Sequence, residues 1–319
     1  SVWRTYRPMS LPGCEMGDNA VYVLREDTLT GDLWLGGNGK ISLLDARSGR
    51  FVPFSCNERV DGIVREICFG RKGEVWIHNY PHCLMYSKKM RALKKYRFMW
   101  KGRTVDPTAV YVDGEGWLWI GFANIGIGRI DESGKRVEIV ARYENTPMQL
   151  CDYGKDSLLM GTLSRGLYVL NKHTGGIRKL LMEGKGEDMY VNKIEPLSDG
   201  RYLIGTLSGI YVLENGVFVQ HLSHERFKPW SLSGNGIHDI YEDRKGNVWV
   251  GTERDGADFY SRQMADFVIL QPDGAEGQHG DFTVTALVED VDGRLWMGAE
   301  DGNLYVCRLQ SGVPPSYRF

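Results

Sequence analysis

The residues with the greatest capacity for chemistry are a few carboxylates and histidines in short polar segments. Glu253, Asp255 and Glu300 could act as acid and base on a glycoside or could hold a metal ion. Their spacing, however, singles out neither a metal cage nor an acid/base pair. His78 and His82 have the i, i+4 spacing of a helical zinc site, but a proline between them rules out the helix. We therefore expect no catalytic residue, no metal and no other cofactor in this chain.

Other polar and aromatic residues suit ligand binding better than catalysis. Aromatic rings can stack on the C–H faces of a sugar, while amides and charged groups can pair with its hydroxyls. Residues of these types recur in short segments between apolar stretches, although a solvated loop remains the alternative for each of them. The candidate ligand-binding residues are Asn38, His78, Asn79, Tyr80, Asn124, Arg165, Trp230, Glu253, Arg254, Asp255 and Asp301.

A ten-residue repeat positions these segments. It reads D-R-K-G-N-V-W-V-G-T from Asp243 to Thr252, with a near-copy from Asp290 to Ala299. The tryptophan position of this template, here called the slot, recurs at steps of 42, 43, 40, 44, 46 and 47 residues. Such a period is typical of stacked or radially arranged units. The slot residues are Trp34, Trp76, Trp119, Leu159, Leu203, Trp249 and Trp296.

Each repeat has the pattern of four short strands. The first strand alternates apolar and polar residues, as in Thr283 to Val288, and a D-x-x-G turn leads to the second strand, which carries the slot. A third strand such as Gly209 to Leu213 and a more polar fourth strand such as Val217 to Gln220 follow. Seven such units predict an all-β, seven-bladed β-propeller of four-stranded antiparallel blades. We expect the slot residues to fill the wedges between blades.

The repeats favour a single domain over residues 1–319, with the seven repeats in 19–310 and an exit linker in 311–319. Residues 1–8 resemble an outermost strand, because a loop separates them from the first strand of the first repeat. We expect this N-terminal strand to close the ring by pairing Val2 to Arg7 with Asn303 to Arg308, which would leave no open sheet edge.

Composition excludes some classes of partner. The net charge of −2, with acids and bases interleaved, argues against nucleic acid or an anionic membrane surface. There is no run of 18 apolar residues that would predict a membrane-spanning helix. The six cysteines are scattered without a C-x-x-C pair, so they leave the redox compartment open.

The segment from Ser231 to Thr252 resembles a known family. It reads S-L-S-G-N-G-I-H-D-I-Y-E-D-R-K-G-N-V-W-V-G-T and is similar to the two-component regulator propeller repeat. The resemblance implies the periplasmic sensor region of a hybrid two-component histidine kinase, with oligosaccharides or other glycan fragments as ligands. It also implies an adjacent propeller and an immunoglobulin-like module of the same parent protein as partners, followed by a membrane span and kinase domains.

Three functions remain open at this stage. The first is a ligand-sensing module, and the second is a structural or dimerisation propeller that forms a homodimer and does not itself bind ligand. The third is a propeller hydrolase or lyase, since propellers also support catalysis. Titration of ligands into this chain and into a longer parent separates the first two, and a metal scan with a turnover assay tests the third.

Overall fold

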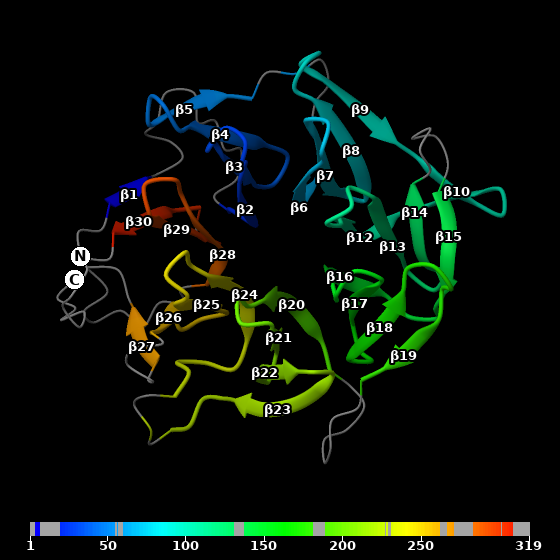
Figure 1. Ribbon diagram of the computed structural model, residues 1–319. Coiled ribbons are helices and arrows are strands. Elements are labelled where there is room, and N and C mark those ends of the chain that lie inside the picture. Colours follow the sequence, from blue (N-terminus) through cyan, green and yellow to red (C-terminus); the bar gives the residue numbers. More distant parts are fainter. Residues whose placement is uncertain are drawn as a thin grey trace.

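The computed structural model describes the backbone of residues 4–6, 20–54, 56, 60–130, 137–180, 189–226, 228, 231–261, 267–270, 283–300 and 302–308. Within these ranges the chain has no α-helix, and its strands form seven four-stranded antiparallel sheets and one two-stranded hairpin. Figure 1 shows the seven sheets arranged radially around a central axis. The predicted seven-bladed β-propeller is confirmed.

The strands of each blade follow one another along the chain. Blades 1 and 2 contain β2 (Val23–Glu26), β3 (Leu33–Gly36), β4 (Ile41–Asp45), β5 (Arg50–Pro53), β6 (Ile63–Phe69), β7 (Glu74–Tyr80), β8 (His82–Ser87) and β9 (Ala92–Tyr96). A hairpin of β10 (Phe98–Trp100) and β11 (Arg103–Val105) then precedes blade 3. Blades 3 and 4 contain β12 (Pro107–Val112), β13 (Leu118–Phe122), β14 (Gly126–Ile130), β15 (Val137–Arg142), β16 (Pro147–Asp152), β17 (Ser157–Thr162), β18 (Leu167–Asn171) and β19 (Ile177–Lys179).

The remaining three blades have the same order. Blades 5 and 6 contain β20 (Val191–Pro196), β21 (Tyr202–Thr206), β22 (Gly209–Glu214), β23 (Val217–Leu222), β24 (Ile237–Glu242), β25 (Val248–Thr252), β26 (Ala257–Tyr260) and β27 (Phe267–Leu270). Blade 7 contains β28 (Val284–Glu289), β29 (Arg294–Ala299), β30 (Leu304–Arg308) and, as its fourth strand, β1 (Arg4–Tyr6). The first strand of each blade lies nearest the axis (Figure 1).

The N-terminal strand closes the ring. Arg4, Thr5 and Tyr6 pair antiparallel with Val306, Tyr305 and Leu304. The pairing predicted for this end of the chain is therefore confirmed for Arg4–Tyr6. The other residues of the predicted closing strand, and the predicted linker at 311–319, lie outside the described residues, and the single-domain boundaries stay a prediction.

The slot residues fill the spaces between blades, as expected. Each of the seven is at most 8% exposed, and Trp119, Trp249 and Trp296 are among the largest fully buried side chains. Burial of one indole, with about 200 Å² of surface, contributes about 5 kcal/mol before conformational entropy is subtracted. These contacts repeat around the ring, so they hold each blade against the next.

The glycine two residues after the slot has a packing reason. A Cβ added at Gly36, Gly161 or Gly251 would lie 2.5, 2.4 or 2.8 Å from a valine side chain at the start of the next inner strand (Val64, Val191 or Val284). Since real Cβ atoms are not found at such distances, only glycine lets the next blade approach this closely. The repeat therefore carries glycine here for a contact between blades.

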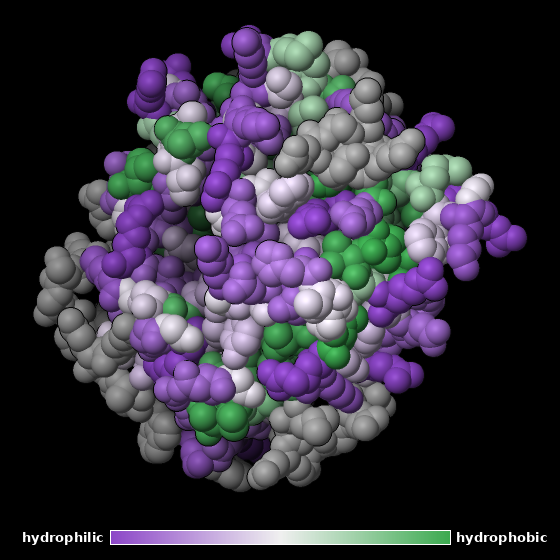
Figure 2. Space-filling view, turned by 45° about the vertical axis from the view of Figure 1, so that its right-hand side comes forward, coloured by the Kyte–Doolittle hydropathy of each residue, from purple (hydrophilic) through white to green (hydrophobic). Residues whose placement is uncertain are grey.

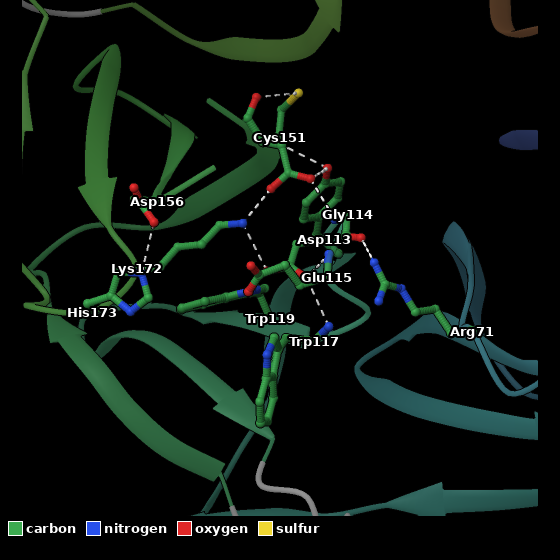
Figure 3. A network of polar contacts seen from close by, with 12 residues as sticks. Arg71, Asp113, Gly114, Glu115, Trp117, Trp119, Cys151, Asp156, Lys172 and His173 are labelled. Carbon is green, nitrogen blue, oxygen red and sulfur yellow. Dashed lines mark hydrogen bonds and ion pairs between the residues drawn. The ribbon is translucent and has the colours of Figure 1, made fainter. Parts of the chain in front are cut away.

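The aspartate six residues before the slot, present in three repeats, binds the slot indole. The Nε1 atoms of Trp119, Trp249 and Trp296 donate to Asp113, Asp243 and Asp290 over 2.8, 3.2 and 2.8 Å. The second carboxylate oxygen of Asp113 accepts the N–H groups of Glu115 and Trp117, at 3.0 and 2.9 Å. One carboxylate thus fixes both the D-x-x-G turn and the buried aromatic (Figure 3).

A buried lysine and a half-buried lysine join two pairs of neighbouring blades. Lys172 of blade 4 is 4% exposed and places its Nζ 3.0 Å from Asp113 of blade 3 and 2.7 Å from Asp152 of its own blade (Figure 3). Lys88, at the matching position of blade 2, pairs with the fully buried Asp27 of blade 1. Polar bridges therefore accompany apolar packing between these blades.

The outer surface is mainly polar. Figure 2 shows hydrophilic residues over most of one side of the ring, with hydrophobic residues gathered right of centre. Within the described ranges, no helix is of a length and hydropathy that would cross a membrane. Cys68, Cys83 and Cys151 are free thiols, and the side chains of Cys14 and Cys307 lie outside the described residues.

Candidate functional site

A cavity of about 550 Å³ opens on the axis of the propeller, at the end where the inner strands begin. Two structural features supply its lining. The first is the beginning of each inner strand, and the second is the set of loop tips between the second and third strands of blades 6 and 7, which contribute Glu253, Arg254 and Glu300. This axial cavity therefore collects side chains from all seven blades.

A recurrent β-bulge explains how the inner strands line the cavity. In six blades the pairing of the first strand with the second shifts by one residue. A bulge leaves one residue without a direct partner and re-aims its side chain. The bulged residues, with the matching Tyr22 of blade 1, form what we call the bulge ring. Its members are Tyr22, Arg65, Thr108, Met148, Asn192, His238 and Thr285.

Two members of the bulge ring also bond to the next blade. The Asn192 amide donates to the Ile237 carbonyl over 2.9 Å, and the Thr285 hydroxyl donates to the Val21 carbonyl. Thr108 has a buried Oγ1 without a hydrogen-bond partner in the described part of the chain. Asn192 and Thr285 are thus fixed by the next blade, whereas Arg65 and His238 are the exposed members of the ring.

Charges of both signs face the axial cavity. The guanidinium of Arg65 lies 4.8 Å from the centre of the Tyr80 ring, a distance at which cation–π attraction orients an arginine. Glu253, Arg254 and Glu300 approach from blades 6 and 7. The cavity can therefore offer donors and acceptors to a polar molecule at several points around its wall.

His78 is neutral and belongs to the contact between blades 2 and 3. It occupies the position that carries glycine two residues after the slot in the other repeats, and it is 2% exposed. Its Nε2 lies 3.1 Å from the Pro107 carbonyl of blade 3. Burial, opposed by the contact with the Pro107 carbonyl and aided by the charge of Arg65, lowers the pKa of His78 to about 4. At neutral pH this imidazole adds no charge to the cavity.

A cluster of charged residues on the inner strands adjoins the cavity. Arg25 lies 2.8 Å from Glu66, and Lys193 lies 2.6 Å from Asp239 and 3.5 Å from Glu195. Burial lowers the pKa of Lys193, but Asp239 and Glu195 outweigh this and raise it above its ordinary value. Burial also raises the pKa of Glu195. Removal of one partner from a buried ion pair lowers the stability of the fold, because the other charge then stays buried without compensation.

A second cavity of about 350 Å³ is lined in part by this cluster, through Arg25, Glu66, Lys193 and Glu195. It shares Glu66, Tyr111, Gln149 and Leu150 with the axial cavity. These shared residues form the waist of the axial channel. Among the residues that the structure describes, no group of three His, Cys, Asp or Glu side chains could hold a metal ion.

The structure brings together some of the residues that the sequence singled out. His78, Glu253 and Arg254 line the axial cavity, and Tyr80 packs against Arg65 at its edge. Asn79 is 1% exposed, and its amide donates to the Gly62 carbonyl over 2.9 Å, so its side chain serves the fold.

The other candidates lie at loop positions away from the cavity lining or outside the described residues. Asn124 occupies a turn with φ of 57°, and Arg165 and Asp255 are exposed. Asn38 forms an isolated bridge to Ile63. Trp230 and Asp301 lie outside the described residues.

Sequence reasoning missed the bulge ring, although the repeat contained a signal for it. Six of its members stand eleven residues before their slot residue, as Arg65 does before Trp76, and Tyr22 stands twelve before Trp34. The same offset in six of the seven repeats could have marked these residues as equivalent. An alternating strand pattern alone does not show which of them a bulge turns toward the axis.

Comparison with known proteins agrees with the fold and with the repeat. The profile of the two-component regulator propeller family matches residues 231–254. The chain carries the two-component regulator propeller repeat. Comparison with curated proteins gives no match. The matched segment runs from the loop before blade 6 through the second strand of that blade to the Arg254 tip at the axial cavity.

Solved structures with this fold include extracellular domains of two component systems and a lyase. The extracellular domains of the hybrid two component systems BT3049 and BT4673 from B. thetaiotaomicron align with TM-scores of 0.72 and 0.75, each at 17% identity over 97% of this chain. The alignment covers 42% of each of those chains. Virginiamycin B lyase from Staphylococcus aureus aligns with a TM-score of 0.70 and 14% identity, over 97% of this chain and 99% of its own. Identities this low establish the propeller fold and nothing finer.

Proposed function

We propose that this propeller is an extracytoplasmic ligand-sensing module of a hybrid two-component histidine kinase and that it binds oligosaccharides or related glycan fragments in its axial cavity. The observation that carries the proposal is the cavity itself. It is ringed by one side chain from each blade and has unpaired polar groups of several kinds. A sugar needs many donors and acceptors arranged around it, and this ring supplies them.

The repeat family and the similar sensor structures support the same function. The match to the regulator propeller repeat spans residues 231–254 and ends at the loop tip that carries Glu253 and Arg254, which line the cavity. Two of the similar structures are extracellular domains of hybrid two component systems, and both chains are more than twice as long as the part that aligns. A longer parent protein would provide the neighbouring modules to which a bound ligand transmits its signal.

Binding would act through the position of the ring rather than through deformation of its blades. The interfaces between blades are tightly packed, because glycine is required at the contacts and the slot residues are buried. Packed interiors resist gradual deformation, whereas contacts between domains can change discretely. We therefore expect a ligand at the mouth of the axis to change how this ring meets an adjacent propeller or a second copy of the chain.

The experiment is a calorimetric titration with a panel of neutral and acidic oligosaccharides, using the wild-type chain, Met148→Trp and Met90→Trp. Met148 lines the axial cavity, so an indole there should fill it and abolish binding. Met90 is 76% exposed, so Met90→Trp is the matched control and should bind normally.

Two results would contradict the proposal. If neither this chain nor its longer parent binds any member of the panel, the ring is not a glycan sensor and a structural or dimerisation role is favoured. If Met148→Trp binds as well as the wild type, the ligand site lies elsewhere. Product formation during the titration would support the lyase class instead.

A further inference from the structure

Arg65 differs from Arg25 and Arg244 in having no carboxylate partner among the described residues. Arg25 and Arg244 pair with Glu66 and Glu26, each at 2.8 Å. Arg65 is exposed in the axial cavity, and within the described ranges no carboxylate lies at ion-pair distance from its guanidinium. Its contact is with the Tyr80 ring, which leaves the donor edge of the guanidinium free for a ligand.

Carboxylates stand on the far side of the same cavity. Glu253 and Glu300 belong to the loop tips of blades 6 and 7, and their side-chain oxygens have no hydrogen-bond donor in the described part of the chain. Figure 1 shows blade 6 across the axis from blade 2, which carries Arg65. Arg254 follows Glu253 at the blade 6 tip, so this side of the cavity carries two carboxylates and one guanidinium. The cavity therefore has a cationic side at blade 2 and an acceptor-rich side at blades 6 and 7.

We propose that the ligand is an acidic oligosaccharide whose sugar carboxylate is bound by Arg65 and whose hydroxyls donate to Glu253 and Glu300. This inference rests on the proposed function and narrows the class of glycan. A guanidinium fork matches a carboxylate in a two-point contact. Ionised glutamates accept hydroxyl donors but repel an anion, so they orient the acidic group toward blade 2.

The surroundings of Arg65 strengthen its role. His78 lies on β7, the strand that pairs with the strand of Arg65, and it is neutral at pH 7 because burial and the charge of Arg65 hold its pKa near 4. The aromatic face of Tyr80 positions the guanidinium before ligand binds. A positioned donor group loses less conformational entropy on binding than a free side chain does.

The test compares three forms of one disaccharide: a uronic acid, its methyl ester and the corresponding neutral sugar. Isothermal titration calorimetry at 50 and 200 mM NaCl measures each dissociation constant for the wild type, Arg65→Met and Arg65→Lys. We expect the acid to bind the wild type about 10- to 100-fold more tightly than the ester. Arg65→Met should lose this preference and leave ester binding unchanged, and Arg65→Lys should retain part of it.

Arg178→Met is the matched control, because Arg178 is exposed on β19 at the outside of blade 4. It should bind all three sugars as the wild type does. If the wild type binds the acid and the ester equally tightly, the inference is overturned while a glycan site stays in place. The same holds if Arg65→Met loses affinity for the acid and the ester to the same extent. Failure of every sugar in every panel would overturn the proposed function and this inference together.

Discussion

Replacement of Asp113 by alanine tests the polar contacts that join blades 3 and 4. The Asp113 carboxylate accepts the N–H groups of Glu115 and Trp117 and the indole N–H of Trp119, and it lies 3.0 Å from the Nζ of Lys172 (Figure 3). Asp113 is 4% exposed. The substitution thus removes the acceptor of one turn and one anchor of a buried cation.

The magnitude follows from these contacts. Removal of one partner of a buried ion pair costs about 3–5 kcal/mol, because the other charge stays buried. A buried N–H group left without an acceptor costs about 1–3 kcal/mol. Lys172 keeps Asp152 at 2.7 Å, which offsets part of the first cost. We therefore expect the free energy of unfolding to fall by about 5 kcal/mol in Asp113→Ala.

Asp243→Ala is the matched control for the turn and the indole. Asp243 accepts the N–H groups of Lys245 and Asn247 and the indole N–H of Trp249, but within the described ranges it has no ion-pair partner. We expect this variant to lose about 2 kcal/mol. The difference between the two variants measures the contribution of the buried lysine.

Urea denaturation, followed by tryptophan fluorescence and circular dichroism, provides the assay. The double variant Asp113→Ala/Lys172→Met should recover part of the loss, since no unpaired charge then remains between the blades. Equal losses of stability in Asp113→Ala and Asp243→Ala would refute this reasoning. So would a double variant whose loss equals the sum of the losses in Asp113→Ala and in Lys172→Met alone.

Three further predictions concern single features of the ring. Burial raises the pKa of Asp258 from 3.8 to about 7, so the folded protein holds a proton that the unfolded chain releases, and stability should fall as pH rises from about 4 to about 7. Asp258→Asn should remove this slope and gain on the order of 3 kcal/mol at pH 8 in urea titrations, whereas an unchanged slope would contradict the assignment. Gly161→Ala should lose about 1–3 kcal/mol through overpacking against the next blade, while Gly176→Ala, whose added Cβ meets only the Thr174 hydroxyl at 3.3 Å, should stay near wild type. Removal of residues 1–8 deletes the strand that pairs with Leu304–Val306 and should lower the melting temperature sharply; an unaltered value would show that the ring closes without it.

The fold was predictable because its core is periodic. Six of the seven slot residues are followed two positions later by glycine, and six are preceded three positions earlier by a turn glycine, so each recurrence adds independent support for one architecture. The aspartates at 113, 243 and 290 could be assigned to turns from sequence. Their bonds to the slot indoles could not, because the direction of a side chain after a turn depends on tertiary packing.

The candidate site was predictable only in part. The exposure of Glu253 and Arg254 on a loop tip was predictable from their position after the second strand of blade 6, and both residues line the cavity. His78 also lines the cavity, but its ring is held against the Pro107 carbonyl of the next blade. These two residues are 29 positions apart in the sequence, so their contact was not evident from it. Arg65 and His238 lie in strands whose alternation gave no sign of a bulge, so their direction toward the axis became evident only from the register of the sheets.

The most direct test of the central claim is a crystal structure of this chain with a bound oligosaccharide. The account predicts sugar density on the propeller axis, within hydrogen-bond distance of bulge-ring residues such as Arg65 and His238 and of the Glu253 tip. Density confined to the outer strands, or to the opposite mouth beyond Glu195, would contradict it.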